Sequence, residues 1–293
     1  MVLKNFFDGL RHPAEGLRAA NLAYKYQARM EAEKWHQAVP IIQEYLKIVP
    51  SDDGAWSDLG NVLTELGRDE QALECYKKAI KFSPENSEHW YNKAETLADL
   101  EKYDDAITAY RKSIRYSEGK DSEDIIDSWY GIAWVSGLQD HPASGLAAID
   151  AALDIDKDDY DLWHLKSVLL LQKKKYKECL KACLKAFKID PEDPYSHLHE
   201  AEAHLGLGDL IQANSAVTLA IKLDKNNADA YEVKAKILLE QDKKNDALKS
   251  IDKAIETDAD SPSYVFYTKA MILSSMGNQE DALDALIVAT AIN

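Results

Sequence analysis

Large and small residues recur along the chain at a nearly constant interval. Four tryptophans are separated by 34, 39 and 34 residues: Trp56, Trp90, Trp129 and Trp163. A series of small residues keeps the same interval: Ala38, Ala72, Ala106, Gly145, Cys179, Ala213, Ala247 and Ala282. A second small series runs seven residues behind the first. Because independent series agree on one period, the chain is predicted to consist of tandem repeats.

The interval divides the chain into eight units, with extra residues near 117–125 and near 262. The predicted repeats lie near 19–52, 53–86, 87–120, 126–159, 160–193, 194–227, 228–261 and 263–293, after a capping segment at 1–18. In the second unit, the residues that share one side of a first helix are Trp56, Leu59, Gly60 and Leu63. Those that share one side of a second helix are Ala72, Tyr76 and Ala79. Each unit is therefore predicted to be two amphipathic helices joined by a short turn.

This spacing, Trp-x-x-Leu-Gly-x-x-Leu followed by Ala-x-x-x-Tyr and Pro, resembles the tetratricopeptide repeat (TPR) family over about residues 19–293. The resemblance implies an all-α fold, a right-handed α-solenoid (superhelix) of tandem helix-turn-helix units. It also implies that the first helix of each unit lines a concave groove that holds another protein, and that catalytic residues are absent. Since no unit can bury its apolar faces alone, we expect one stacked array.

Composition narrows the partners and the compartment. Lys and Arg number 35 against 51 Asp and Glu, a net charge of -16, which would repel a phosphate backbone and argues against nucleic acid. Cys75, Cys179 and Cys183 are too few for a disulfide framework. No apolar run approaches the roughly 20 residues that span a bilayer. We expect a cytoplasmic, acidic protein without a membrane span or a secretory signal.

The side of the first helices opposite their packed side is unusually apolar and aromatic for a solvated surface. We expect a partner-binding groove there, lined by Tyr91, Asn92, Tyr130, Trp134, His164, Val168, Leu171, Tyr195, Leu198, His199, Glu202, Tyr264 and Tyr267. Any single one of these side chains could instead pack against neighbouring helices. Carboxylates on the same side are Asp127, Asp161, Glu202, Asp229 and Glu232. The predicted partner is a protein or peptide with apolar anchors and flanking basic residues.

A more specific binding mode of this family fits poorly. Asn61 and Asn92 match the two asparagines of the carboxylate clamp that co-chaperones of this family use. The cations of that clamp are replaced by Ser57, Asp127 and Gly131. A carboxylate ligand would then lack charge-assisted hydrogen bonds, so the clamp is not predicted.

No catalytic, metal or cofactor site is predicted. Cys179 and Cys183 lie four residues apart on one helix face, but other units place core residues at these positions. His164 and His199 could approach each other, yet no further ligand stands at metal-binding spacing. The sequence contains no phosphate-binding glycine loop and no nucleophile elbow, so enzyme activity is not expected.

Three other segments have open interpretations. A basic stripe, Lys173, Lys174, Lys175, Lys177, Lys181, Lys185 and Lys188, is read as a solvated outer face or, alternatively, as a second docking surface. Met1–Leu10 is predicted to form an amphipathic cap, the less favoured alternative being a surface-membrane anchor. The apolar C-terminal residues Leu286–Val288 and Ile292 allow either a homo-oligomer through an uncapped last repeat or a longer chain.

The favoured function is a non-catalytic protein-protein interaction scaffold or adaptor, which binds a partner polypeptide in an apolar, aromatic and acidic concave groove. The alternative is a regulatory or substrate-recruiting TPR part of a larger enzyme or complex.

Overall fold

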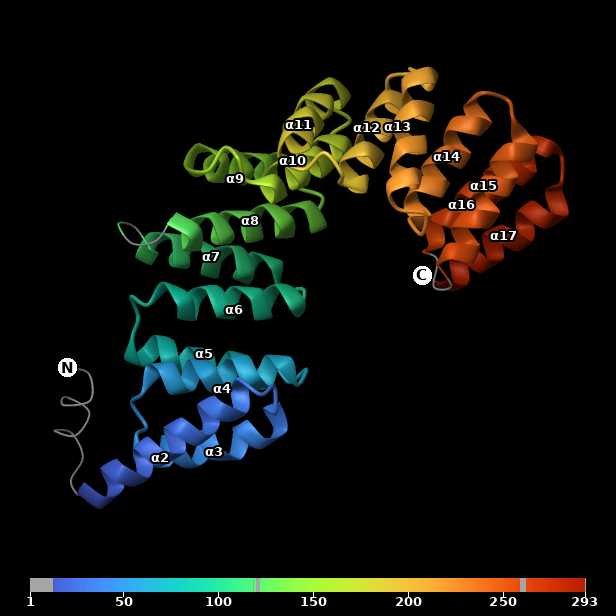
Figure 1. Cartoon of the computed structure of the whole chain (residues 1–293). Coiled ribbons are helices and arrows are strands. Elements are labelled where there is room, and N and C mark those ends of the chain that lie inside the picture. Colours follow the sequence, from blue (N-terminus) through green and yellow to red (C-terminus); the bar gives the residue numbers. More distant parts are fainter. Residues whose placement is uncertain (1–12, 118, 120–121, 259–261, 293) are drawn as a thin grey trace. The chain divides into compact units, whose positions relative to one another are not determined.

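The computed structural model describes residues 13–117, 119, 122–258 and 262–292. These residues form 16 helices and no strand. Figure 1 shows the helices following one another as pairs. The predicted all-α fold of tandem helix pairs, an α-solenoid, is thereby confirmed. The predicted cap at Met1–Leu10 lies outside the described residues.

The chain forms two compact units, residues 1–139 (unit 1) and 140–293 (unit 2). The helices of unit 1 are α2 (Pro13–Met30), α3 (Trp35–Ile48), α4 (Asp53–Glu65), α5 (Asp69–Phe82), α6 (Ser87–Asp99), α7 (Tyr103–Ser117) and α8 (Ser122–Leu138). Those of unit 2 are α9 (Pro142–Ile155), α10 (Tyr160–Gln172), α11 (Tyr176–Ile189), α12 (Pro194–Gly206), α13 (Leu210–Leu223), α14 (Ala228–Glu240), α15 (Lys244–Thr257), α16 (Ser263–Met276) and α17 (Gln279–Ile292). Even-numbered helices are the first helices of their repeats, and odd-numbered helices are the second.

The helix boundaries differ from the sequence-based units in two places. Helix α2 begins at Pro13, before residue 19, and α8 begins at Ser122, before residue 126. The boundary between the units falls between Gln139 and Asp140, inside the fourth repeat, whereas the sequence suggested one continuous array. The repeat period is continuous across this point, so periodicity alone does not reveal the division.

Side-chain caps mark the start of several first helices, and a left-handed residue follows the end of each one. The Asp52 Oδ1 atom accepts a hydrogen bond from the Ala55 N–H at 2.9 Å, an N-cap that satisfies a free backbone donor. Equivalent side-chain caps stand before α6, α10, α12 and α14: Asn86, Asp159, Asp193 and Asn227. The turn inside every repeat contains one left-handed residue: Glu33, Gly67, Glu101, Asp140, Lys174, Gly208, Asp242 and Gly277. This conformation stops the first helix and turns the chain toward the second.

Small residues let the helices approach closely. A Cβ atom at Gly60 of α4 would lie 2.5 Å from the Tyr76 ring of α5, in the same repeat. One at Gly131 of α8 would lie 2.4 Å from the Tyr110 ring of α7, in the preceding repeat. The two tyrosines occupy the same position of their second helices and are almost fully buried. Each therefore fills a space that only a glycine on the facing helix leaves open.

We predict that Gly60→Ala lowers stability, because the added methyl group overpacks against Tyr76. Overpacking costs about 1–3 kcal/mol, which exceeds the gain of up to about 1 kcal/mol in helix propensity. Thermal unfolding followed by circular dichroism should show a lower Tm. Gly54→Ala in the same helix is the matched control, because its Cβ would meet only a side-chain oxygen at 3.4 Å. Equal Tm values for the two variants would contradict this packing.

Candidate protein-binding site

The predicted groove residues fall on two rows of first helices. In unit 1, α4 contacts α6 and α6 contacts α8; in unit 2, α10, α12, α14 and α16 follow one another in the same way. We call the surface formed by Asn61, Tyr91, Asn92, Glu95, Tyr130 and Trp134 the unit 1 face. We call the surface formed by His164, Val168, Leu171, Tyr195, Glu202, Asp229, Lys236, Tyr264, Tyr267 and Met271 the unit 2 face.

The amides of the unit 1 face are bonded to one another. The Asn92 side chain donates to Asn61 Oδ1 at 3.1 Å and to Ser57 Oγ at 3.4 Å. The Tyr76 hydroxyl donates to the same Asn61 oxygen at 2.8 Å. These side chains thus join α4, α5 and α6, and they bring no cation to the position where a carboxylate clamp needs one.

Aromatic side chains occupy the rest of the unit 1 face. The Tyr91 ring meets the Tyr110 ring edge to face, with 5.9 Å between centroids, and the Tyr110 hydroxyl donates to Glu95. Tyr130 is half-buried, whereas about half of the Trp134 surface is exposed. Trp134 is therefore the most accessible apolar anchor among the predicted residues of this face.

His164 of the unit 2 face lies against His199, a buried histidine of the next repeat. The His164 and His199 ring centroids lie 4.9 Å apart, and Tyr160 and Tyr195 flank His164 at 5.8 and 6.2 Å. His199 Nδ1 lies 2.8 Å from the Ser167 hydroxyl oxygen. Burial lowers the pKa of His164 and lowers that of His199 to about 3. Both rings are consequently neutral at pH 7 and form an aromatic seam between α10 and α12.

The structure does not place all the predicted residues at the surface. Leu198 is only 4% exposed and packs with Ala201 and Val217 in the core between α12, α13 and α14. His199 is also buried. The expectation that these two side chains are open to a partner is wrong, because Leu198 packs in this core and His199 lies against His164 between α10 and α12. Leu171 is partly buried against the core around Cys179, and Val168 is partly exposed.

At the centre of the unit 2 face, Glu202, Asp229 and Lys236 lie close to a buried carboxylate, Glu232. Glu232 is only 2% exposed, and its Oε1 atom lies 2.7 Å from Lys236 Nζ and accepts a hydrogen bond from the Thr268 hydroxyl. Glu202 stands on the neighbouring helix α12. Burial raises the pKa of Glu202 to about 7; Lys236 opposes the rise, and Glu232 and Asp229 add to it. Lys236 contacts Glu232 and acts on Glu202, and the Asp229 carboxylate accepts a hydrogen bond from Tyr264, so the cluster holds three acidic side chains and one lysine. An added cation would favour the charged form of Glu202.

Tyrosines flank these carboxylates. The Tyr264 hydroxyl donates to Asp229, and burial raises the pKa of Tyr264. Tyr195, Tyr264 and Tyr267 all expose a large part of their rings. Lys236 was not among the sequence-predicted residues. Its position four residues after Glu232 on one helix is the signal that could have identified it.

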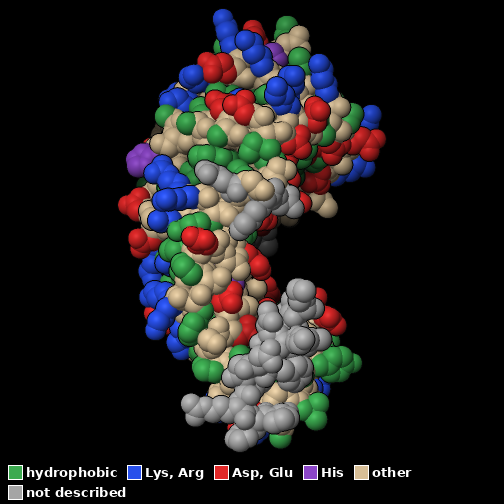
Figure 2. All heavy atoms as spheres, turned by 90° about the vertical axis from the view of Figure 1, so that its left-hand side faces the viewer, with side chains coloured by type: hydrophobic (Ala, Val, Ile, Leu, Met, Phe, Trp, Pro, Cys, Tyr) green, Lys and Arg blue, Asp and Glu red, His purple; other side chains and the backbone are tan. Residues whose placement is uncertain are grey.

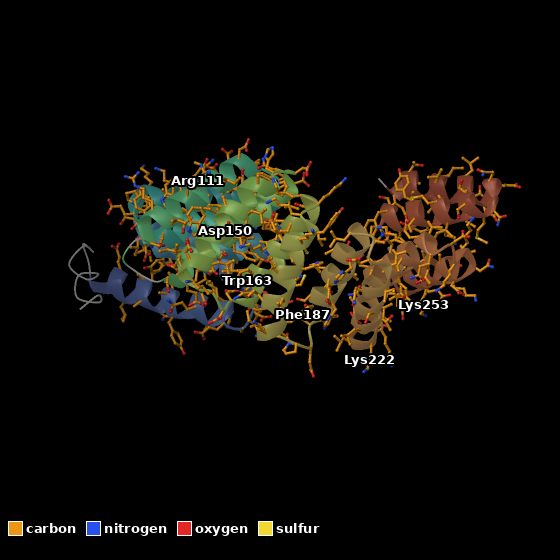
Figure 3. All side chains as sticks on the ribbon, turned by 90° about the horizontal axis from the view of Figure 1, so that it is seen from above. Arg111, Asp150, Trp163, Phe187, Lys222 and Lys253 are labelled. Atoms are coloured by element: carbon orange, nitrogen blue, oxygen red, sulfur yellow. The ribbon has the colours of Figure 1, made fainter. Side chains whose placement is uncertain are left out.

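The second helices of unit 2 carry exposed lysines. Figure 3 shows Lys222 and Lys253 on the second helices α13 and α15, and Phe187 on α11. The predicted basic stripe on and before α11 is exposed throughout. On the surface drawn in Figure 2, apolar side chains reach the solvent between charges of both signs.

The described residues contain no group of three or more His, Cys, Asp or Glu side chains that could hold a metal ion. Cys75, Cys179 and Cys183 are buried free thiols. In the same part of the chain, no helix is both long and apolar enough to cross a membrane.

Family models match several stretches of the chain. A TPR repeat model matches residues 60–100, one tetratricopeptide repeat model matches residues 88–119 and 160–193, and another matches residues 198–262. Together these segments cover more than half of the chain. No curated protein matches the sequence.

Solved structures of similar fold are repeat proteins. A tetratricopeptide repeat protein from Parabacteroides merdae superposes with a TM-score of 0.66 at 16% identity, over 93% of this chain and 98% of that one. YrrB, a TPR protein with an unusual peptide-binding site, gives 0.55 at 17% identity, over 66% of this chain and 97% of its own. Pseudomonas aeruginosa pilF gives 0.62 at 16% identity, over 76% and 99%.

At such identities the superpositions show the fold alone. Family models and helix pairs nevertheless agree with the repeat spacing, so the predicted membership is confirmed. The chain belongs to the tetratricopeptide repeat family.

Proposed function

We propose that this chain is a non-catalytic adaptor that binds a partner polypeptide along the unit 2 face. Tetratricopeptide repeats generally serve as protein-interaction scaffolds. The observation that carries the proposal is the excess of carboxylates over lysine at Glu202, Asp229 and Glu232. A basic side chain of a partner would remove this imbalance, since each added cation pairs with a partly desolvated carboxylate.

The aromatic rings next to the carboxylates supply apolar contact area. Tyr195, Tyr264 and Tyr267 are rigid, amphipathic side chains of the kind that dominate protein interfaces. YrrB, a TPR protein of similar fold, has a peptide-binding site. We therefore propose a segment with an apolar or aromatic anchor next to Lys or Arg as the partner. The three free thiols favour a reducing compartment, and we assign the protein to the cytoplasm.

We predict that Glu202→Gln stabilises the protein at pH 8 but not at pH 4. The folded-state pKa of about 7 exceeds the ordinary value of 4.5, so the folded protein binds more protons between these values. Its stability therefore falls as pH rises from about 4.5 to 7, and glutamine removes that fall. The gain at pH 8 should be roughly 1–3 kcal/mol.

Urea unfolding at both pH values measures the Glu202→Gln effect. Glu192→Gln, at an exposed turn residue, is the control and should leave stability unchanged at both pH values. A gain that is the same at pH 4 and pH 8 would show that Glu202 does not carry the shifted pKa.

We predict that removing carboxylates from the unit 2 face weakens peptide binding. The probes are fluorescein-labelled peptides with a Trp, Phe or Leu anchor flanked by Lys and Arg, each matched by a peptide with Glu in place of the basic residues. The wild-type protein should bind the peptides that contain Lys and Arg and should not bind the matched peptides that contain Glu. The double variant Glu202→Gln, Asp229→Asn should bind them about 10–100 times more weakly, because charged hydrogen bonds contribute about 1.5–3 kcal/mol.

The control variant removes the same charge elsewhere. Asp246→Asn with Glu256→Gln alters two exposed carboxylates of α15 and should bind the peptides as the wild type does. An equal loss of peptide affinity in both double variants would show that the loss follows the net charge of the protein and not the position of the carboxylates. Equal binding of basic and acidic peptides would contradict the proposal.

A further inference from the structure

An apolar hollow lies among the helices of the first two repeats, away from the unit 1 face. Its volume is about 740 Å³, and it is bounded by α3, α4 and α5. Leu59 and Asn61 of α4 are two residues apart, so they point in nearly opposite directions from the helix axis. Asn61 belongs to the unit 1 face and Leu59 lines the hollow. The apolar residues of the hollow are Leu46, Trp56, Leu59, Leu63 and Cys75.

Two other junctions between repeats have an ion pair at the corresponding place. Lys166 Nζ lies 2.6 Å from Asp150 Oδ1, and Lys269 Nζ lies 2.7 Å from Asp252 Oδ1. In each pair the lysine belongs to a first helix and the aspartate belongs to the second helix before it. The lysine side chain therefore bridges the two helices.

The junction between the first two repeats has uncharged residues instead. The repeat period places Leu59 where the two lysines stand and Gln43 where the two aspartates stand. The groove lined by Lys269 and Asp252 has a volume of about 410 Å³, against about 740 Å³ for the hollow at Leu59. Because leucine is shorter than lysine and has no charge to pair, the apolar floor of this hollow stays open.

The two ends of the hollow carry opposite charges. Lys47 of α3 and Lys78 of α5 stand at the end beside Trp56, and Lys78 Nζ lies 3.9 Å from the centre of the Trp56 ring. Glu70 of α5 lines the other end. It stands eight residues before Lys78, which is about 12 Å along the helix.

The polar side chains between these ends already have partners. Glu74 pairs with Lys77 at 2.7 Å, and Gln71 accepts a hydrogen bond from Arg68. The charges that remain for a ligand are therefore basic at one end of the hollow and acidic at the other.

A helix suits this hollow better than an extended segment. The backbone groups of α3, α4 and α5 are bonded within their own helices, and the floor between them is apolar. A segment that lies on this floor must satisfy its own backbone N–H and C=O groups, as an α-helix does. The span of about 12 Å between Glu70 and Lys78 equals about two helical turns.

We propose that this hollow binds an amphipathic helix of a partner protein. The helix lays an apolar stripe on the floor, with an acidic residue near its N-terminus at Lys47 and Lys78 and a basic residue about two turns later at Glu70. This order also suits the dipole of the bound helix, whose N-terminus is stabilised by negative charge. The hollow belongs to unit 1, so the proposal does not depend on peptide binding by the unit 2 face.

Selection from a display library of single-helix peptides, randomised on one side, tests this proposal with the full chain. Peptides selected on the wild type should carry the apolar stripe with the acidic residue before the basic one. The closing variant Gln43→Asp, Leu59→Lys introduces the ion pair of the other junctions. Fluorescence anisotropy should show that it binds the selected peptides about tenfold or more weakly, because the lysine side chain occupies the place of an apolar anchor.

Reversing the charges at one end tests the order without altering the apolar floor. Lys47→Glu with Lys78→Glu should also weaken binding about tenfold or more, and peptides with Lys in place of the acidic residue should regain the loss. This variant carries the test even if the closing variant fails to fold. Lys177→Glu with Lys188→Glu changes two exposed lysines of α11 and is the matched control, which should bind as the wild type does.

Three results would each overturn the proposal. They are a library that yields no peptide able to distinguish the wild type from both the closing and the charge-reversed variants, selected peptides without the acidic-before-basic order, and equal losses of affinity in the two lysine variants. The variant Glu202→Gln, Asp229→Asn should bind the selected helices normally. Failure of the unit 2 face to bind peptides is thereby distinguished from failure of this hollow.

Discussion

The structure depends on one contact, the packing of each first helix on both helices of the preceding repeat. Side chains such as Tyr110 and Ile251 stand at the middle of a second helix and are buried beneath the first helix of the following repeat. Glycine or another small residue on the covering helix makes room for them, as Gly131 does for Tyr110. No helix pair can bury these residues by itself, so stability passes from neighbour to neighbour along each unit.

Because this packing uses only part of each first helix, the remaining side is free to carry function. In unit 2 that side combines exposed tyrosines with carboxylates that are partly desolvated. Glu202 shows the consequence, since burial raises its pKa to about 7 and only Lys236 opposes the rise. Burial of the unit 2 face by a partner would strengthen the attraction between these carboxylates and a basic side chain. The backbone scaffold and the candidate site are thus properties of the same helices.

The repeat period made the fold predictable, because residue size at fixed places directly reflects how close two helices come. The same argument explains what the sequence left undecided. Leu198 and Tyr195 share a side of α12 in a helical projection, yet Leu198 is buried in the core and Tyr195 is exposed. A projection of a single helix omits its neighbours, and the neighbours decide burial. Left-handed turn residues at Glu33, Glu101 and Lys174 were equally hidden, since only glycine signals that conformation in a sequence.

Hydrogen exchange of the full chain tests the central claim most directly. If each helix is protected by the neighbours that cover it, amides in α2 and α17 should exchange much faster than those in α5 and α13, which have neighbours on both sides. Uniform protection along the chain would contradict the account.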